Sequence, residues 1–436
     1  MPRILAVSAL ALAVLLDSRA AIAQHEHPRP ETTPTPVPRQ PGPAGEEPNP
    51  NPMAAMEAMK PMDRWMTMLH GYAFLTENRQ GGSSGDREFE SQNHVMVMAM
   101  RRWAGGKLSL LGTFTLEPAT IPVEGSSELF QRGETYRDVL LVDRQHPHDL
   151  FVQLAASWEK LIEPASLRLY LAPVGEPALG PVAYPHRLSA SENPLAPLSH
   201  HNQDSTHITY DVITAGITAS VVTLEGSVFH GAEPDENRWN IEAGGLDSYS
   251  GRITLRPLPS LAIQFSVGHL EHPEAIEPGD QTRTSASVTY EKSLPGGFLA
   301  ASLIFGRNQT PEGPEWGNLL EWTWKFADKN FVYGRLESVD RDVYELRHKR
   351  QRPESVPRNR TRVDAATFGY VRNVPWLGKI ESGLGGGITL YRFSDRLDST
   401  YGAHPISFQV FYRLRFGTHH AARETMPGME HHHGEP

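Results

Sequence analysis

Histidine and aspartate residues gather in two short stretches of the sequence. The stretch RQHPHDLF contains His146, His148 and Asp149, and the stretch SHHNQDSTHITYD contains His200, His201, Asp204 and His207. Imidazole and carboxylate groups are ligands of divalent transition metals, so these stretches predict a metal site or a site for an anionic ligand. The alternative is a hydrogen-bonded loop network that forms a constriction. If residues 205–214 form a strand, their alternation predicts that His207 points inward.

A second pattern combines methionine with histidine in two neighbouring segments. In residues 92–103, His94, Met96 and Met98 alternate with valine, and in residues 66–75, His70 shares its parity with two methionines. If the valines face outward, both rows face the interior, and antiparallel pairing of the segments brings the rows side by side. Thioether and imidazole groups suit copper, so the rows predict a path for a metal ion. The alternative places the methionines outside as plain apolar surface.

The C-terminal segment 417–436 holds a third set of candidate ligands. It contains Met426, Met429, His431, His432 and His433. The order Met-x-Gly-Met-x-His resembles the repeat of bacterial copper-resistance proteins, some of which are outer-membrane barrels. The resemblance implies that the tail binds copper, and it departs from that family in having one copy of the motif where the family has several.

A serine and an aspartate beside these histidines raise the alternative of an outer-membrane hydrolase. Ser205 with His207, or Asp149 with His148, could supply a nucleophile and a base. The glycines of a nucleophile elbow do not surround Ser205. We therefore expect no enzyme activity and no required cofactor, with copper or another divalent transition metal as the candidate ligand. Adhesion or another form of loop-mediated binding is a further alternative.

The two ends of the chain have distinct compositions. Residues 1–23 have the basic start, apolar run and small-residue site of a cleaved signal peptide. Residues 24–61 are rich in proline and methionine and predict an extended periplasmic leader. No later apolar run is long enough for a membrane-spanning helix, which excludes a helical membrane protein. The formal net charge of −10 argues against a nucleic-acid partner.

About sixteen segments alternate apolar with polar residues, as strands do when their two faces meet different surroundings. They cover residues 66–75, 92–103, 107–117, 149–160, 166–173, 205–214, 218–230, 247–256, 261–270, 283–292, 297–307, 317–326, 330–339, 362–373, 379–392 and 406–416. Every second link is short, such as AGG, ITAG and LPGG, and the intervening links are long.

This alternation of short and long links resembles that of porin-type β-barrels of bacterial outer membranes, which have short periplasmic turns and long extracellular loops. The resemblance covers residues 62–416. It implies an all-β fold, a single transmembrane antiparallel barrel of about sixteen strands with both ends in the periplasm. Side chains such as Phe265 would then contact lipid. A watery lumen would be lined by Gln264, Glu321, Arg413 and Arg415.

The function expected from this architecture is an outer-membrane channel for small hydrophilic solutes or ions. Copper export or homeostasis is the more specific hypothesis. The expected partners are the lipid bilayer of the outer membrane and a small solute or metal ion, with a homotrimer as the candidate assembly. A soluble β-sandwich or a propeller is the alternative fold. A propeller would repeat every 40 to 50 residues or so, and the sequence has no such repeat.

Overall fold

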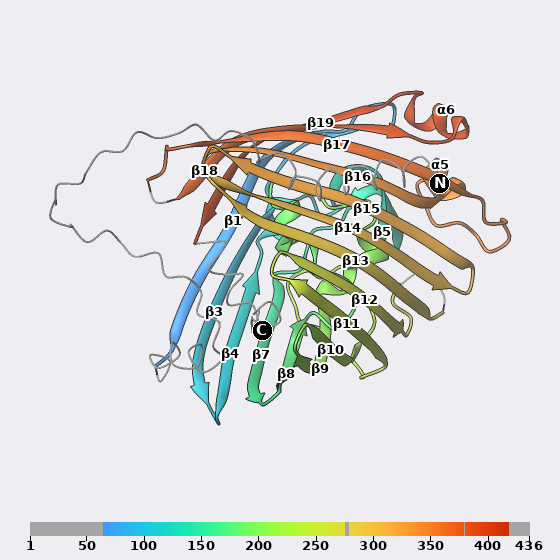
Figure 1. Cartoon of the computed structure of the whole chain (residues 1–436). Helices are drawn as coiled ribbons and strands as arrows, with labels where there is room; N and C mark the ends of the chain where they lie inside the picture. The colour runs from blue at the N-terminus through green and yellow to red at the C-terminus, as the bar shows by residue number, and fades with distance from the viewer. Residues whose placement is uncertain (1–63, 275–278, 379, 418–436) are drawn as a thin grey trace, which may run out of the picture.

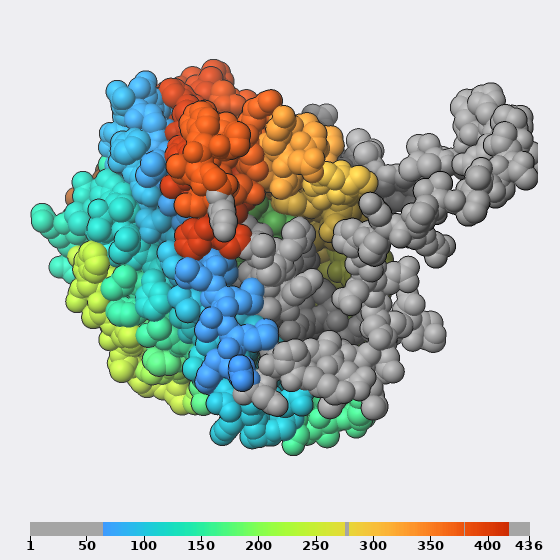
Figure 2. Space-filling view, turned by 90° about the vertical axis from the view of Figure 1, so that its left-hand side faces the viewer, coloured from blue at the N-terminus to red at the C-terminus, as the bar shows by residue number. Residues whose placement is uncertain are grey.

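The computed structural model describes residues 64–274, 279–378 and 380–417. In it, 16 antiparallel strands form one closed β-barrel (Figure 1). Strand β1 pairs with β19 from Gly71↔Phe416 to Arg79↔Phe408, and this pairing closes the barrel. In Figure 2 the blue N-terminal strands accordingly lie beside the red C-terminal ones. The predicted fold is confirmed. The predicted signal peptide, leader and tail motif lie outside the described residues.

The barrel strands follow one another around the wall in chain order. They are β1 (Met66–Arg79), β3 (Asn93–Trp103), β4 (Gly106–Phe114), β7 (Phe151–Ile162), β8 (Ala165–Gly175), β9 (Thr209–Ala219), β10 (Val222–His230), β11 (Ser248–Leu258), β12 (Leu261–Leu270), β13 (Gln281–Leu294), β14 (Gly297–Thr310), β15 (Gly313–Phe326), β16 (Asn330–Asp342), β17 (Arg360–Val374), β18 (Glu381–Arg392) and β19 (Ile406–Phe416). A short strand, β2 (Arg87–Glu90), pairs with the last four residues of β1, Thr76–Arg79.

Alternation along each strand gives the barrel an apolar outer face and a polar inner face. In β12, Phe265 and Val267 are 48% and 44% exposed, whereas Gln264 and Ser266 are buried. In β19, Phe408 and Val410 face outward, and the inward residues include Arg413. A continuous exposed apolar band is unfavourable in water and matches the hydrocarbon layer of a membrane. Within the described residues, no helix is long and apolar enough to cross a membrane.

The links between strands are tight at one end of the barrel and mostly long at the other. Ala104 and Gly105 join β3 to β4 with φ of 52° and 72°, the left-handed conformations that a two-residue hairpin turn needs. The long links carry α5 (Val343–His348) and α6 (Asp398–Tyr401), which lie at the same end in Figure 1. Both strand ends that close the barrel, at Met66 and Phe416, lie at the tight-turn end.

Two predicted links differ from the structure. The residues ITAG lie inside β9, and the turn to β10 falls instead at Ser220–Val221, where Ser220 has a φ of 51°. The link between β14 and β15 was expected to be long, but only residues 311–312 separate these strands because both extend beyond their predicted bounds. Strict alternation of short and long links is therefore broken once.

Two long links fold back into the barrel. The inserted hairpin consists of β5 (Ser126–Tyr136) and β6 (Val139–Gln145), and the inserted loop consists of residues 176–208. Nε of Arg187 donates to Oε1 of Glu321 at 2.7 Å, and Nε2 of Gln203 donates to the carbonyl oxygen of Gly317 at 3.1 Å. These contacts fix the inserted loop against β15, across the barrel from β8.

The inserted loop changes which side chains line the open lumen. A cavity of about 620 Å³ remains between the loop and the tight-turn end. Gln264 and Arg415 line this cavity, as predicted. Glu321 and Arg413 do not line it, because Glu321 binds Arg187 and Arg413 binds Glu192 of the inserted loop.

Candidate metal centre

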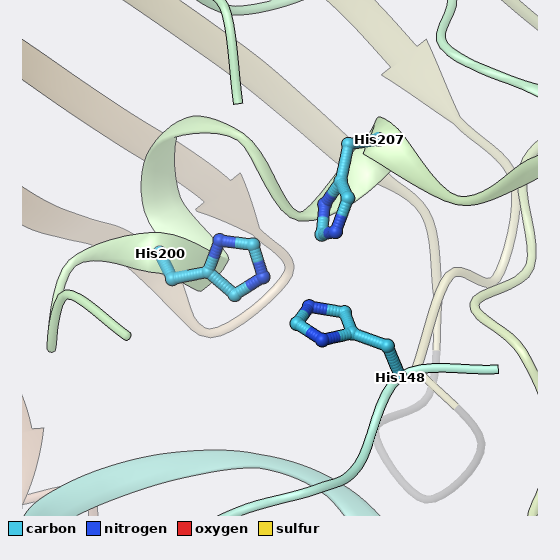
Figure 3. Close-up of side chains that lie close together, drawn as sticks. All are labelled: His148, His200 and His207. Carbon is cyan, nitrogen blue, oxygen red and sulfur yellow. The ribbon is translucent and has the colours of Figure 1, made fainter. Parts of the chain in front are cut away.

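Three buried imidazoles converge at the base of the inserted loop. His148 precedes β7, His200 begins α4 (His200–Gln203), and His207 ends η4 (Ser205–His207), so two separate segments supply the group. Figure 3 shows the three rings pointing toward one another. One ring nitrogen from each lies within 4.8 Å of those of the other two. We call this group the trihistidine centre.

The other ring nitrogen of each histidine is held by an oxygen acceptor. Nδ1 of His148 lies 2.7 Å from Oε2 of Glu117, a residue of α3 (Glu117–Thr120). Nδ1 of His200 lies 2.7 Å from Oδ1 of Asp204, and Nδ1 of His207 lies 3.0 Å from the carbonyl oxygen of Asp204. A carbonyl or an ionised carboxylate only accepts hydrogen bonds, so each Nδ1 carries the proton. In the neutral rings, Nε2 therefore presents its lone pair.

The charge state of the centre follows from burial and two carboxylates. Burial lowers the pKa of His200 to about 4 despite the opposing effect of Asp204, and burial holds the pKa of His207 well below its usual value. For His148, burial also disfavours the charge, but Glu117 outweighs it and raises the pKa. Asp204 is ionised because Arg187 and His200 lower its pKa against the cost of burial. Two of the three ligands are thus neutral at pH 7.

The geometry suits a divalent ion bound by three imidazoles. Metal-bound histidines generally donate their second N–H to a carboxylate or a carbonyl oxygen, and all three histidines here do so. Nε2 of His207 is buried and has no hydrogen-bond partner among the described residues. Four ligands at about 2.1 Å around an ion would stand roughly 3.4 Å apart, so a bound ion would draw the rings slightly closer. The Tyr184 hydroxyl, 3.3 Å from Nε2 of His148, lies next to the open position.

The other predicted members of the rim group have partners of their own. Nε2 of His146 lies 2.9 Å from Glu134. Asp149 accepts hydrogen bonds from Tyr210 at 2.8 Å and from Arg238 at 3.1 Å. Asp204 serves as the acceptor for the trihistidine centre instead of facing the ion.

His201 belongs to a second group of possible ligands, together with Glu233 and Glu274. Their ligand atoms lie within 4.8 Å of one another. Ser205 donates a hydrogen bond to Glu233 at 3.1 Å and accepts one from Arg283. An arginine already provides positive charge here, so this group is a weaker candidate for a cation than the trihistidine centre.

The inward direction of His207 was predicted for the wrong reason. Strand β9 begins at Thr209, so His207 is not part of it. Within β9, Tyr210 and Val212 are buried, although alternation in step with an inward His207 would place them outside. Asp211 has a φ of 54°, which interrupts the regular alternation. His207 faces the interior because it belongs to the inserted loop.

The methionine and histidine rows face inward, as predicted. Pairing of β1 with β3 sets His70 opposite Met96 and Met68 opposite Met98. His70, His94 and Met96 line the cavity. Met98 packs with Met96, Met100 and Leu111 in an apolar cluster but does not line the cavity. Met98 is therefore placed as a core residue, away from the open space.

Several residues of these sites were not predicted from the sequence. Glu117, Tyr184, His186, Glu233 and Glu274 stand in no motif with the histidines. Tyr184 and His186 are the ends of one short turn, η2 (Tyr184–His186), in which Tyr184 is buried and His186 lines the cavity. Only the fold of the inserted loop brings them to the sites.

The residue pairs required for the hydrolase alternative are not formed. Ser205 donates to Glu233 and accepts from Arg283 at 2.8 Å, while His207 directs Nδ1 to a backbone carbonyl. Asp149 binds Tyr210 and Arg238, and His148 binds Glu117. Each candidate base is therefore turned toward a partner other than its proposed nucleophile.

Comparison with known proteins gives matches among solved structures alone. No family model matches the chain, and no curated protein matches it. The matches are bacterial outer-membrane porins and related barrels, each of low sequence identity. An anion-selective porin from Comamonas acidovorans is similar with 12% identity and a TM-score of 0.49, over 81% of this chain and 100% of that one. OprB of Pseudomonas putida is similar with 7% identity and a TM-score of 0.47, over 84% and 97%. OmpT of Vibrio cholerae, described as a trimer form, has 11% identity and a TM-score of 0.45, over 81% and 100%. The homotrimer expected for this chain stays a prediction.

Proposed function

We propose that this protein is a barrel of the bacterial outer membrane that binds a divalent transition metal ion and moves it across that membrane. The observation that carries the proposal is the trihistidine centre, in which one ring nitrogen of each histidine lies within 4.8 Å of those of the other two and each Nδ1 is held by an oxygen acceptor. Imidazole ligands suit copper and zinc, and the predicted tail motif favours copper. The apolar outer face supports the membrane location.

The inserted loop makes this a gated barrel in our proposal. The ligands His200 and His207 belong to the loop that fills the barrel, whereas His148 precedes a wall strand. Passage of an ion through the barrel requires the loop to move, because ion pairs with Glu321 and Arg413 hold it across the lumen. In the proposed orientation the tight turns, the leader and the tail face the periplasm, so export would begin at the 620 Å³ cavity.

Metal analysis of the purified full chain tests the proposal. Protein loaded with Zn²⁺ or Cu²⁺ and freed of unbound ion should hold one more equivalent than the His200→Ala/His207→Ala variant. The control is His230→Ala, because His230 is paired with Asp247 outside the centre. Equal metal content in all three proteins, together with unchanged copper tolerance of the cells, would identify the barrel as a general porin.

A further inference from the structure

A second group of metal donors lies on the cavity wall, apart from the trihistidine centre. We call His70, His94, Met96 and His186 the wall site, and all four line the cavity. His70 and Met96 are direct partners in the β1–β3 pairing, and Nε2 of His70 lies 3.1 Å from Sδ of Met96. An imidazole nitrogen and a thioether sulfur thus share one face at ligand spacing.

Two further imidazoles line the same cavity from different elements. His94 of β3 and His186 of η2 meet edge to face, with ring centroids 4.8 Å apart. Nε2 of His94 is buried and has no hydrogen-bond partner among the described residues. A buried nitrogen left in this state costs about 1–3 kcal/mol, and a bound ion would remove that cost. Tyr72, stacked on His94 with ring centroids 5.6 Å apart, holds the ring in place.

The donor set of the wall site differs in kind from the trihistidine centre. It combines a thioether with imidazoles, whereas the centre contains imidazoles alone. Among the charged side chains that line the cavity, Arg168 and Arg252 both pair with Glu225. Neutral, soft donors favour a soft monovalent ion, and the chain has no cysteine to compete for it.

We propose that the wall site binds Cu(I) and is the entry site of the barrel for copper. This inference rests on the proposed function in metal transport and names the ion and its point of entry. The cavity lies toward the tight-turn end, where the proposed orientation admits periplasmic copper. Thioether ligands hold Cu(I) more weakly than thiolates would, as an entry site must in order to release its ion inward.

The turn η2 connects the wall site with the trihistidine centre. His186, at one end of this turn, belongs to the wall site, and Tyr184, at the other end, lies against His148 of the centre. The two metal sites are therefore separated by a single short turn of the inserted loop.

Anaerobic loading with Cu(I) tests the proposal on the full chain. Met96→Leu removes the thioether and keeps the volume of the side chain. Met98→Leu is the matched control, because Met98 lies on the same strand and in the same apolar cluster as Met96 but does not line the cavity. Copper per protein and the copper–sulfur signal in X-ray absorption are measured in wild type and both variants. Methionines outside the described residues contribute equally to all three proteins.

We expect Met96→Leu to lose one equivalent of Cu(I) and part of the copper–sulfur signal, with Met98→Leu unchanged. His94→Gln should show the same loss, which keeps the test valid if one variant fails to fold. Equal Cu(I) content in Met96→Leu and Met98→Leu overturns the wall site. Zn²⁺ content is measured in the same proteins and in the His200→Ala/His207→Ala variant, and it reports on the trihistidine centre separately. The proposal for the wall site can therefore fail while the proposal for the trihistidine centre holds, or the reverse.

Discussion

Glu192 of the inserted loop and Arg413 of β19 form an ion pair with both side chains fully removed from solvent, although 221 residues separate them in the chain. Arg415 joins the same carboxylate at 3.2 Å. One carboxylate therefore binds two arginines of the barrel wall, and this contact fixes the middle of the inserted loop across the lumen.

Replacing Glu192 with glutamine should release the inserted loop. Loss of the charge leaves two buried guanidinium groups without their main partner, which costs about 3–5 kcal/mol. We expect higher single-channel conductance in planar bilayers and faster cleavage of residues 176–208 by added protease. Glu381→Gln is the control, because Glu381 contacts the same arginines but is partly exposed. If both variants conduct like the wild type, Glu192 does not hold the loop in place.

Glu117→Gln should weaken metal binding at the trihistidine centre without removing a ligand. The carboxylate of Glu117 sets the proton of His148 on Nδ1, and loss of such a partner lowers metal affinity by roughly 10–100-fold. Competition titration with a Zn²⁺ indicator would measure the change. Glu128→Gln, which changes a buried carboxyl of the inserted hairpin, serves as the control. An equal effect of both variants would point to a general loss of packing inside the barrel.

An arginine on the outer face of the barrel should destabilise the fold more strongly the nearer it lies to the middle of the lipid bilayer. Ile253 and Leu258 are both exposed apolar residues of β11, and Leu258 lies at the tight turn. Ile253→Arg is expected to cost about 2–4 kcal/mol of folding free energy in lipid vesicles, and Leu258→Arg about 0–1. Urea titration of the barrel folded in vesicles would measure both. Similar costs at the two positions would contradict the membrane placement.

Stability should fall between about pH 5 and pH 8 because of Glu176, which lines the cavity. Burial raises the pKa of this carboxyl to about 7. Below its unfolded pKa of 4.5 the group is protonated in both states, and as the pH rises towards 7 the unfolded state ionises first and is favoured.

Glu176→Gln removes this effect, so its melting temperature relative to the wild type should rise by a few degrees from pH 5 to pH 8. The scans are made in detergent with a chelator present. Glu163→Gln, at an exposed tight turn, is the control and should show no such trend. A difference that stays constant with pH would show that Glu176 does not titrate in this range.

The wall of the barrel could be predicted from the sequence because its signal is local. Residues such as Phe265 and Gln264 differ in polarity from their immediate neighbours, and that difference alone sets the two faces of a strand. The two faces of β9 were misassigned because the positive φ of Asp211 is invisible in a polarity pattern. The turn to β10 was placed too early, at ITAG, and falls at Ser220–Val221.

The interior was harder to predict because its contacts are distant in the chain. The histidines of the trihistidine centre stood out by residue type, but Glu117 lies 31 residues before His148 and in no motif with it. The same holds for Arg187, which binds Glu321 at a separation of 134 residues. Partners of this kind depend on how the loop folds into a finished barrel, which alternation along single strands does not encode.

The seam between β1 and β19 sets the order in which the barrel can be assembled. Until β19 pairs with Gly71–Arg79, both β1 and β18 keep a row of unsatisfied backbone groups, and such open edges are not tolerated in lipid. Arg413 and Arg415, which fasten the inserted loop, arrive on the same strand that closes the wall. Closure of the barrel wall and fastening of its interior thus depend on the same strand.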